Sequence, residues 1–274
     1  MLLSTRCLHH ILLICTALLS QTFASPTLLG WKNVSKTLQP ANRGFANNLW
    51  LRIMPLGASI TYGYTSSDGN GYREYLRDMI VDYGNNVNMV GSRRNGTMDD
   101  NDVEGWPGFI IEQVHKKAKT ALPKYKPNVV LINVGTNDCS GNIDIPKAGE
   151  RLTSLLDDVY KGSPHATVIL STLLVRSDPK IQKCVLNVNE QIRSVANTER
   201  EKGYRLVLAD MQPPSGPTTS ELVDGTHPTD AGYAKMATIW FNGISEADEA
   251  GFLLPKESIP GNPYGNPDRG VYDS

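Results

Sequence analysis

The stretch Asn128-Val129-Val130-Leu131-Ile132-Asn133-Val134 decides the fold. Its apolar residues follow one another almost without a break, whereas a strand with one wet face would alternate apolar and polar side chains. A run of this kind predicts a strand that is covered on both faces, as in a parallel sheet with helices on each side. The strand ends at Gly135-Thr136-Asn137-Asp138, a small and polar turn.

Strands and helices alternate on both sides of this stretch. We expect further strands at residues 51–56, 87–90, 167–173 and 204–209, a loop at 93–108, and helices at 71–83, 109–122, 146–161, 185–202 and 231–244. Asp144 is expected to cap the third of these helices. The pattern predicts a three-layer α/β/α sandwich around a flavodoxin-like, doubly wound, mostly parallel five-stranded sheet. Sites in such sheets gather beyond the carboxyl ends of the strands.

The two ends of the chain differ from this central pattern. Arg6 precedes the apolar run 11–19, and Thr22-Phe23-Ala24 has the small residues of a cleavage site, so residues 1–24 are predicted to be a secretory signal peptide. The run is too short to span a bilayer as an ordinary helix. We expect the remaining chain to comprise a surface arm at 25–48, one α/β domain at 49–252 and a Pro/Gly/Asn-rich tail at 253–274.

Composition and charge exclude several classes of partner. The 274 residues are 40% hydrophobic and 20% charged, which is typical of a globular protein. The formal net charge is −1, so no basic field favours nucleic acid or an anionic membrane surface. We therefore expect a soluble, secreted, extracellular monomer with neither nucleic-acid nor membrane partners.

The interpretation of the cysteines and of two short motifs depends on the expected secretion. Two of the four cysteines fall in the predicted signal peptide, which leaves Cys139 and Cys184. An even pair in an oxidising route predicts a disulfide, and two buried thiols are the alternative. Asn33-Val34-Ser35 and Asn95-Gly96-Thr97 match the N-glycosylation sequon.

The predicted strand at 51–56 ends in a turn that carries a hydroxyl. Gly57 and Ala58 let the backbone turn sharply, and Ser59 follows. Such a turn can hold a catalytic nucleophile, or it can be an ordinary junction between a strand and a helix. The choice depends on a base, an acid that orients it and donors for a developing oxyanion.

His227 is the histidine best placed to be that base. Asp224-Gly225-Thr226-His227-Pro228 puts a carboxylate three residues before an imidazole in one loop. A serine hydroxyl is a weak nucleophile until a base takes its proton, and a carboxylate can fix the tautomer of that base. The alternative is a helix-capping sequence with an incidental histidine. We expect His115 and His165 to be surface residues.

The oxyanion donors are sought among glycine amides and asparagine side chains. Gly108, at a loop-to-helix junction, and Asn137, at a strand end, fit this task, and the amide of Ser59 is a third donor. Taken alone, Asn137 followed by an aspartate is also a common turn sequence. What favours the catalytic interpretation is that all these groups occur in order and at strand ends.

Four blocks of sequence together resemble the SGNH hydrolase (GDSL-type esterase) superfamily. They are Gly57-Ala58-Ser59-Ile60-Thr61, Gly105-Trp106-Pro107-Gly108, Gly135-Thr136-Asn137-Asp138 and Asp224-Gly225-Thr226-His227-Pro228. The resemblance implies that Ser59 is the nucleophile, His227 the base and Asp224 its partner. It implies an oxyanion hole of Ser59, Gly108 and Asn137, with Gly105 as the competitor of Gly108. Ala58 departs from the family, which has aspartate there, outside the triad.

Within the superfamily, Glu104-Gly105-Trp106-Pro107-Gly108 and the block spacing are most similar to carbohydrate esterase family three, which contains secreted acetylxylan esterases of fungal type. This resemblance implies a serine esterase without a cofactor that removes acetyl groups from plant cell-wall polysaccharide such as xylan. Tyr62, Tyr64 and Trp106 flank the site in sequence and either stack on sugar rings or serve as packing.

Other functions remain as alternatives or are excluded. A lipolytic or small-ester SGNH hydrolase and a catalytically silent glycan-binding protein stay open. The α/β-hydrolase elbow requires glycine two residues after the serine, where Thr61 stands. Neither a phosphate loop nor a dinucleotide-binding turn follows the first strand, and no histidine pair has the spacing of a zinc site. We therefore expect no metal.

Overall fold

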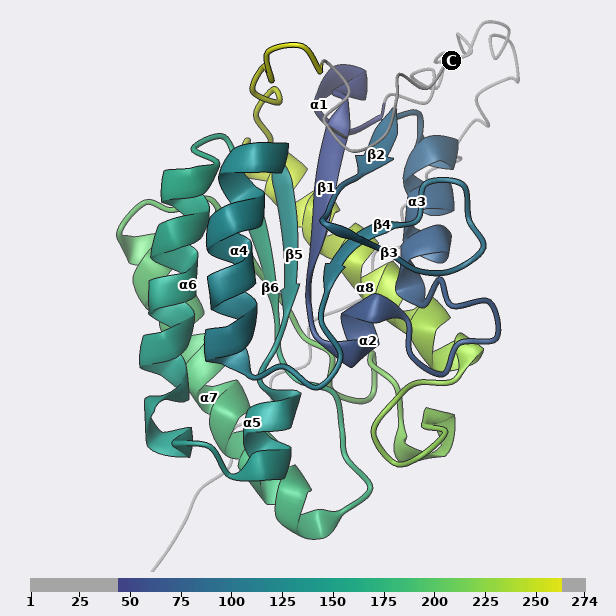
Figure 1. Cartoon of the computed structure of the whole chain (residues 1–274), viewed down its shortest axis with the longest axis vertical. Coiled ribbons are helices and arrows are strands. Elements are labelled where there is room, and N and C mark those ends of the chain that lie inside the picture. The colour runs from purple at the N-terminus through teal and green to yellow at the C-terminus, as the bar shows by residue number, and fades with distance from the viewer. Residues whose placement is uncertain (1–43, 263–274) are drawn as a thin grey trace, which may run out of the picture. The chain divides into compact units, whose positions relative to one another are not determined.

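The computed structural model describes residues 44–262 (Figure 1). The predicted signal peptide, most of the predicted arm, the sequon at Asn33 and the end of the tail lie outside these residues. Among the described helices, none has the length and apolar character needed to cross a membrane.

Five parallel strands form the centre of the sheet, in the spatial order β2-β1-β5-β6-β7. This is the flavodoxin-like order, and it confirms the fold class predicted from the sequence, although the sheet has seven strands in place of the predicted five because a short hairpin adds two. The strands are β1 (Leu51–Gly57), β2 (Val87–Met89), β5 (Val129–Asn133), β6 (Thr167–Ser171) and β7 (Leu206–Ala209).

Both faces of the sheet are buried, as the run at 128–134 predicted. On β5, Val130 and Ile132 belong to one apolar cluster, while Val129 and Leu131 belong to the other. Helices α4 (Ile111–Tyr125), α6 (Ala148–Gly162) and α7 (Pro179–Glu201) pack on the first face, and α3 (Tyr72–Tyr83) and α8 (Asp230–Glu249) on the second (Figure 1). The short helices are α1 (Phe45–Asn48), α2 (Ser59–Tyr62), α5 (Thr136–Gly141) and the 3₁₀ turns η1 (Ile145–Lys147) and η2 (Thr219–Glu221).

The segment predicted to be a loop contains a small hairpin instead. β3 (Arg93–Arg94) pairs antiparallel with β4 (Asp102–Gly105), and β4 pairs with the end of β1, where Gly57 lies opposite Gly105. The prediction was wrong here because the hairpin is polar and short, and its pairing with β1 is a tertiary contact that no local pattern announces.

A proline lies inside the central strand β1 without losing a hydrogen bond of the ladder. Odd-numbered residues of β1 bond toward β2 and β4, as shown by the carbonyl groups of Ile53 and Gly57, which accept from Val90 and Trp106. The nitrogen of Pro55, which carries no hydrogen, is therefore on the side of β1 where pairing passes from the end of β2 to the start of β4. The register with β2 ends at Ile53 and the register with β4 begins at Leu56, so Pro55 lies between the two ladders, where proline is tolerated.

Helix boundaries agree with the predictions to within about three residues except at the start of α7 and at the end of α8 (Asp230–Glu249), which runs five residues further than predicted; the predicted cap of α6 also differs. α7 begins six residues earlier than predicted, since the Asp178 carboxylate accepts from the amides of Lys180 and Ile181 and Pro179 occupies the first turn. Asp144 makes no side-chain capping bond, contrary to prediction; it has a left-handed backbone and its carbonyl oxygen accepts from Lys147. A 3₁₀ turn thus precedes α6.

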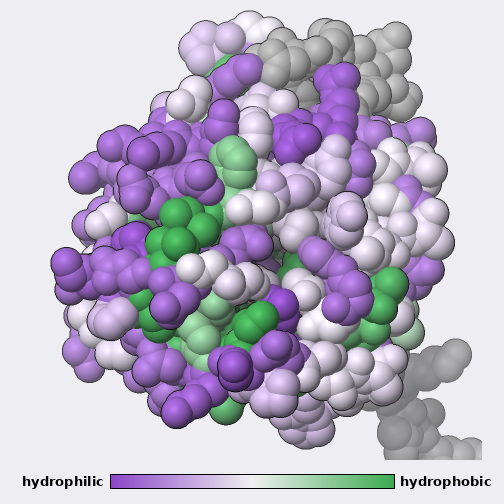
Figure 2. Space-filling model, turned by 60° about the horizontal axis from the view of Figure 1, so that its bottom comes forward, coloured by the Kyte–Doolittle hydropathy of each residue, from purple (hydrophilic) through white to green (hydrophobic). Residues whose placement is uncertain are grey.

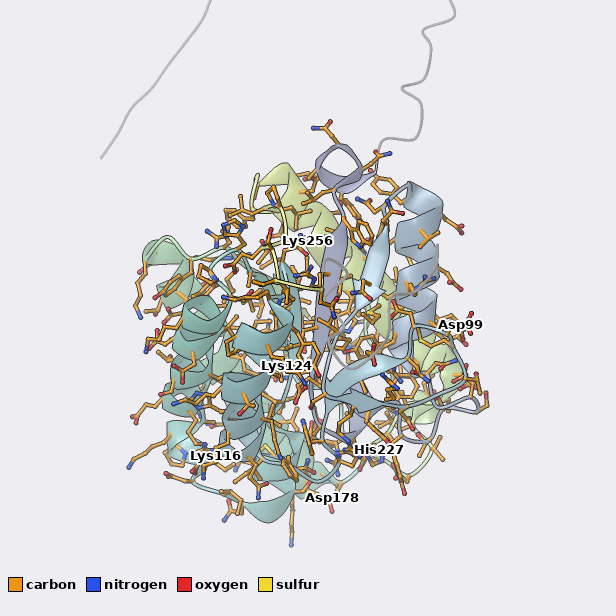
Figure 3. All side chains as sticks on the ribbon, turned by 45° about the horizontal axis from the view of Figure 1, so that its top comes forward. Asp99, Lys116, Lys124, Asp178, His227 and Lys256 are labelled. Atoms are coloured by element: carbon orange, nitrogen blue, oxygen red, sulfur yellow. A yellow bond between two sulfur atoms is a disulfide. The ribbon has the colours of Figure 1, made fainter. Side chains whose placement is uncertain are left out.

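The described ends of the chain pack at the amino end of the strands. Phe45 lies against Tyr83 and Phe241, with ring centroids 4.6 and 5.1 Å away. Beyond α8, the Asn128 side chain donates to the carbonyl of Leu254 at 2.8 Å, and Arg52 donates to that of Glu257 at 3.0 Å. Lys256 accordingly lies at the opposite end of the molecule from His227 (Figure 3).

Candidate active site

The predicted catalytic residues meet beyond the carboxyl ends of β1 and β5. Ser59 opens α2 directly after β1, and Asn137 lies in α5 directly after β5. Asp224 and His227 lie in the loop that leads into α8. β1 and β5 are the strands between which the strand order reverses, which is where open α/β sheets place their ligands.

The nucleophile turn depends on a close approach of the backbone at Gly57. A Cβ atom on this glycine would lie 2.3 Å from both the Asn133 carbonyl oxygen and the Thr61 hydroxyl. The turn itself closes through main-chain bonds, since the amide of Tyr62 donates to the carbonyl of Ala58 at 3.0 Å. The side chain of residue 58 caps nothing in this turn, so alanine forms it without the family's aspartate.

Ser59, His227 and Asp224 form a continuous hydrogen-bonded chain. The Ser59 Oγ lies 2.8 Å from His227 Nε2, and His227 Nδ1 lies 2.7 Å from Asp224 Oδ2. The other carboxylate oxygen accepts from the backbone amides of Thr226 at 3.0 Å and His227 at 2.9 Å. The carboxylate therefore fixes both the ring and the loop that carries it, the arrangement required of a base that activates a serine.

The charge state of Asp224 suits this role. Burial alone would raise the pKa of its carboxyl, but the hydrogen bonds from the His227 amide and ring, with that from Thr226, outweigh burial and hold the pKa below its ordinary value. The carboxylate remains ionised through the mildly acidic range, so it stabilises a protonated imidazole beside it.

Of the two candidate glycines, Gly108 is the accessible one. It is exposed, has φ +81°, and nothing lies within 4 Å of where its Cβ would be. Gly105 is buried in β4, where a Cβ would lie 2.8 Å from the Tyr62 amide nitrogen, and its carbonyl accepts from Arg93 at 3.1 Å. The exposure of Gly108 favours it over Gly105 as the candidate backbone donor.

Asn137 is tied to the same loop. Its Nδ2 donates to the Phe109 carbonyl oxygen at 2.9 Å. An asparagine amide has two hydrogens, so a second N–H is available to an oxyanion.

Helix α5, which carries Asn137, is held by three attachments, two of which the sequence did not indicate. The buried Asp138 accepts from the Ile111 amide at 3.0 Å and from Arg151 at 2.9 Å. Burial raises the pKa of this carboxyl, although both hydrogen bonds oppose the rise. Arg176 donates to the Ser140 hydroxyl and to the Gly225 carbonyl, which joins α5 to the histidine loop.

The predicted disulfide supplies the third attachment. Cys139 and Cys184 are bonded, which confirms the pairing, and they join α5 to α7 with Cα atoms 5.6 Å apart. Asp138 and Arg151 are thirteen positions apart, and no sequence signature links them. Arg176 stands in a loop with no motif around it, so neither attachment was accessible to sequence reasoning.

The two remaining histidines in the described part of the chain lie outside this site. His115 on α4 bonds to Asp158 at 2.7 Å with 17% of its side chain exposed, and the ring of His165 contacts the carbonyl of Pro255. The second sequon is also engaged, since Asn95 Nδ2 donates to the carbonyls of Tyr62 and Gly69 at 2.8 Å each. These residues serve the fold rather than the triad.

The surface at this end of the molecule is mixed. Figure 2 shows separate groups of hydrophobic side chains among hydrophilic ones rather than one continuous apolar area. Three of the exposed large apolar residues are adjacent in sequence to site elements: Tyr64 after α2, Ile143 after α5 and Val223 before Asp224.

Comparisons with known proteins agree with this geometry. A multidomain esterase from Ruminococcus flavefaciens is 32% identical over 225 residues, which are 71% of this chain and 28% of that protein. The chain thus spans less than a third of the length of this relative.

Solved structures show the same fold. A family 3 carbohydrate esterase from Clostridium thermocellum has 25% identity and a TM-score of 0.65, over 73% of this chain and 98% of that one. A carbohydrate esterase family 3 protein from Talaromyces cellulolyticus has 22% identity and a TM-score of 0.62, over 73% and 99%.

The family model described as GDSL-like Lipase/Acylhydrolase matches residues 56–235. This range begins one residue before the first block and ends beyond the histidine loop, so it contains all four blocks that the sequence analysis singled out. The chain therefore belongs to the GDSL-like lipase/acylhydrolase family, the SGNH hydrolases.

Proposed function

We propose that the protein is a secreted serine esterase that removes acetyl groups from plant cell-wall polysaccharide such as xylan. The single observation that carries the esterase part is the chain from Ser59 Oγ through His227 to Asp224, with separations of 2.8 and 2.7 Å. A serine with an oriented base and an accessible oxyanion site is equipped for acyl transfer.

The reaction proceeds in two balanced halves. Ser59 Oγ attacks the ester carbonyl carbon while its proton passes to His227 Nε2, and the resulting oxyanion is held by the amides of Ser59 and Gly108 and by Asn137. The bond to the alcohol then breaks, and the alcohol oxygen takes the proton from His227. Water attacks the acyl-serine, gives its proton to His227, and the carboxylic acid leaves as Ser59 recovers the proton.

The acetyl and polysaccharide assignments are supported by likeness. The solved structures with the same fold include the carbohydrate esterases of Clostridium thermocellum and Talaromyces cellulolyticus. The Glu104-Gly105-Trp106-Pro107-Gly108 block supports the same assignment. Secretion is supported by the predicted signal peptide at residues 1–24 and by the Cys139–Cys184 disulfide, because such bonds persist in oxidising compartments.

The test measures acetate release from acetylated xylan beside a series of synthetic esters from acetate to laurate. We expect cleavage of the xylan esters and a preference for the acetyl group. Ser59→Ala and His227→Ala should each lower turnover on the order of a thousandfold or more. Ser154→Ala, which changes an exposed serine on α6, is the matched control and should leave turnover unchanged.

A different experimental result would contradict each part of the proposal: the mechanism, the substrate and the enzymatic activity itself. Full activity in folded Ser59→Ala protein would overturn the mechanism. A preference for long acyl chains would replace the carbohydrate substrate by a lipid. A wild-type protein that cleaves no ester and is not labelled by a fluorophosphonate would be a binding protein.

A further inference from the structure

Three aromatic residues, Tyr62, Tyr64 and Trp106, flank the candidate site residues in sequence, but the structure leaves only one of their rings open. The Arg93 guanidinium lies over the rings of both Tyr62 and Trp106, 4.5 and 4.8 Å from their centroids. The Trp106 ring is also stacked with Phe109 at 5.5 Å and faces Lys117 at 4.1 Å. Tyr62 and Trp106 therefore hold the loop of Gly108 in place and have little free ring surface for a substrate.

Tyr64 differs because it is 52% exposed while its backbone is fixed. Its amide donates to the carbonyl oxygen of Ser59 at 3.0 Å, and its own carbonyl accepts from the Tyr233 hydroxyl at 2.7 Å. The next residue, Thr65, has a left-handed backbone with φ +71° and donates its hydroxyl to the Pro228 carbonyl at 3.0 Å. The ring is thus attached by short connections to both the nucleophile and the histidine loop.

The Tyr64 ring lies on the side of the site where the departing alcohol of the proposed substrate is expected. Its centroid lies 4.8 Å from that of the His227 ring, with the two planes inclined by 60°. His227 Nε2 faces Ser59 Oγ at 2.8 Å, and in the proposed reaction the departing alcohol receives its proton from that nitrogen. The carbon skeleton of the alcohol begins one bond beyond the protonated oxygen, so it lies within reach of a ring beside His227.

We propose that Tyr64 is a specificity-determining residue whose ring stacks on a ring of the departing alcohol, a pyranose in the proposed substrate. This assignment rests on the proposed esterase function. It adds that the Tyr64 side chain recognises the alcohol part of the ester. An exposed ring held by its backbone loses little conformational entropy when it stacks, so the contact favours ring-shaped over open-chain alcohols.

The test compares three acetate esters that differ only in the alcohol: methyl acetate, cyclohexyl acetate and a monoacetylated methyl xyloside. The variants are Tyr64→Ala and Tyr64→Phe, with Tyr75→Ala, an exposed tyrosine on α3, as control. For Tyr64→Ala we expect kcat/KM to fall about two- to tenfold on the two ring-bearing esters, mainly through KM, as for the loss of one aromatic contact. Methyl acetate should be unaffected, and Tyr64→Phe and Tyr75→Ala should match the wild type on all three esters.

Two results would overturn the assignment. Equal losses on all three esters, with a displaced acid limb of the pH profile, would make Tyr64 a positioning residue for His227. Unchanged kinetics on both ring-bearing esters would show that no stacking contact exists. If the wild type fails to cleave the xyloside, the polysaccharide proposal falls, whereas the ratio of cyclohexyl to methyl acetate still decides the role of Tyr64.

Discussion

Asn137 donates its side-chain amide to the carbonyl oxygen of Phe109 at 2.9 Å, and this bond joins the two segments that carry the proposed oxyanion donors. The same side chain thus has a structural partner and a free N–H. The spacing between Gly108 and Asn137 is consequently fixed before substrate arrives. Preorganised donors of this kind need no rearrangement when charge develops on the carbonyl oxygen.

Replacement of Asn137 should therefore act on the rate rather than on binding. We expect Asn137→Ala to lower kcat by about a hundred- to a thousandfold with little change in KM, as for the loss of one oxyanion donor. Asn137→Asp should be at least as impaired, because a carboxylate cannot donate and repels the oxyanion. Asn187→Ala, an exposed asparagine on α7, is the control. A kcat within a few-fold of wild type in folded Asn137→Ala would contradict the assigned role.

The disulfide should contribute to both stability and rate. Cys139 and Cys184 are 45 positions apart, and closing a loop of that length stabilises the fold by about 4 kcal/mol on the chain-entropy estimate. Since Cys139 lies two residues after Asn137 on α5, the double variant Cys139→Ser/Cys184→Ser should also lose kcat. Urea unfolding and steady-state kinetics measure the two effects separately. Lower stability with unchanged kcat would limit the disulfide to a structural role.

Asn95 is expected to carry no glycan in the folded protein. Both hydrogens of its Nδ2 are donated, to the carbonyls of Tyr62 and Gly69, and a glycan bond would replace one of them. Arg73 donates to the same two carbonyls, at 3.3 and 2.9 Å, so the loss of one Asn95 bond costs only the net value of a hydrogen bond, about 0.5–1.5 kcal/mol. Mass spectrometry of protein secreted by a glycosylating host should find this residue unmodified, and Asn95→Ala should be destabilised by a similar amount. A glycan on Asn95 in the active, folded protein would contradict the expectation.

Asp100 should make stability depend on pH. Burial raises the pKa of its carboxyl to about 6, against the bonds from the Met89 amide and Arg77 that favour the charged form. A group with a raised pKa in the folded state contributes most when it is protonated, so this contribution is lost as pH rises from about 4 to about 6. A carboxyl whose pKa rises from its ordinary value to about 6 on folding changes the free energy of unfolding by roughly 3 kcal/mol across that range.

The variant Asp100→Asn isolates this effect from the other carboxylates. Its amide oxygen can still accept from the Met89 amide, which the carboxylate bonds at 2.8 Å. We expect the free energy of unfolding of the wild type, relative to the variant, to fall between pH 4 and pH 6 and then to level off. Urea denaturation at several pH values measures that difference. A difference that is constant with pH would show that the carboxyl titrates normally.

Sequence reasoning predicted those parts of the molecule whose structure follows from the local sequence, without knowledge of tertiary contacts. The buried run at 128–134 has one physical interpretation, and the residues of the proposed triad stand in compact motifs at the ends of strands or in one loop. The β3–β4 hairpin was missed because polar residues form it only when β1 lies beside them. The choice of Tyr64 over Trp106 was inaccessible for the same reason, since the cations that cover Trp106 come from β3 and α4.

Gly57 offers a test of the contact on which the nucleophile turn is built. In Gly57→Ala, the new methyl group would meet the Asn133 carbonyl and the Thr61 hydroxyl at 2.3 Å, so β1 must move away from β5 or the turn must open. We expect a loss of about 1–3 kcal/mol in unfolding free energy, typical of an overpacked interior, and a lower kcat because Ser59 moves with the turn. Urea unfolding and ester turnover measure the two effects.

Gly149→Ala is the matched control for the same chemical change. Gly149 lies in the first turn of α6, and the nearest atom to its added Cβ, on Val195, is 3.4 Å away, an ordinary contact. Alanine is the better helix former, so this variant should be at least as stable as the wild type and fully active. If the two variants behave alike, the approach of β1 to β5 at Gly57 is looser than 2.3 Å implies. The Ser59 turn would then owe its position to the bonds around Tyr62 and Tyr64 alone.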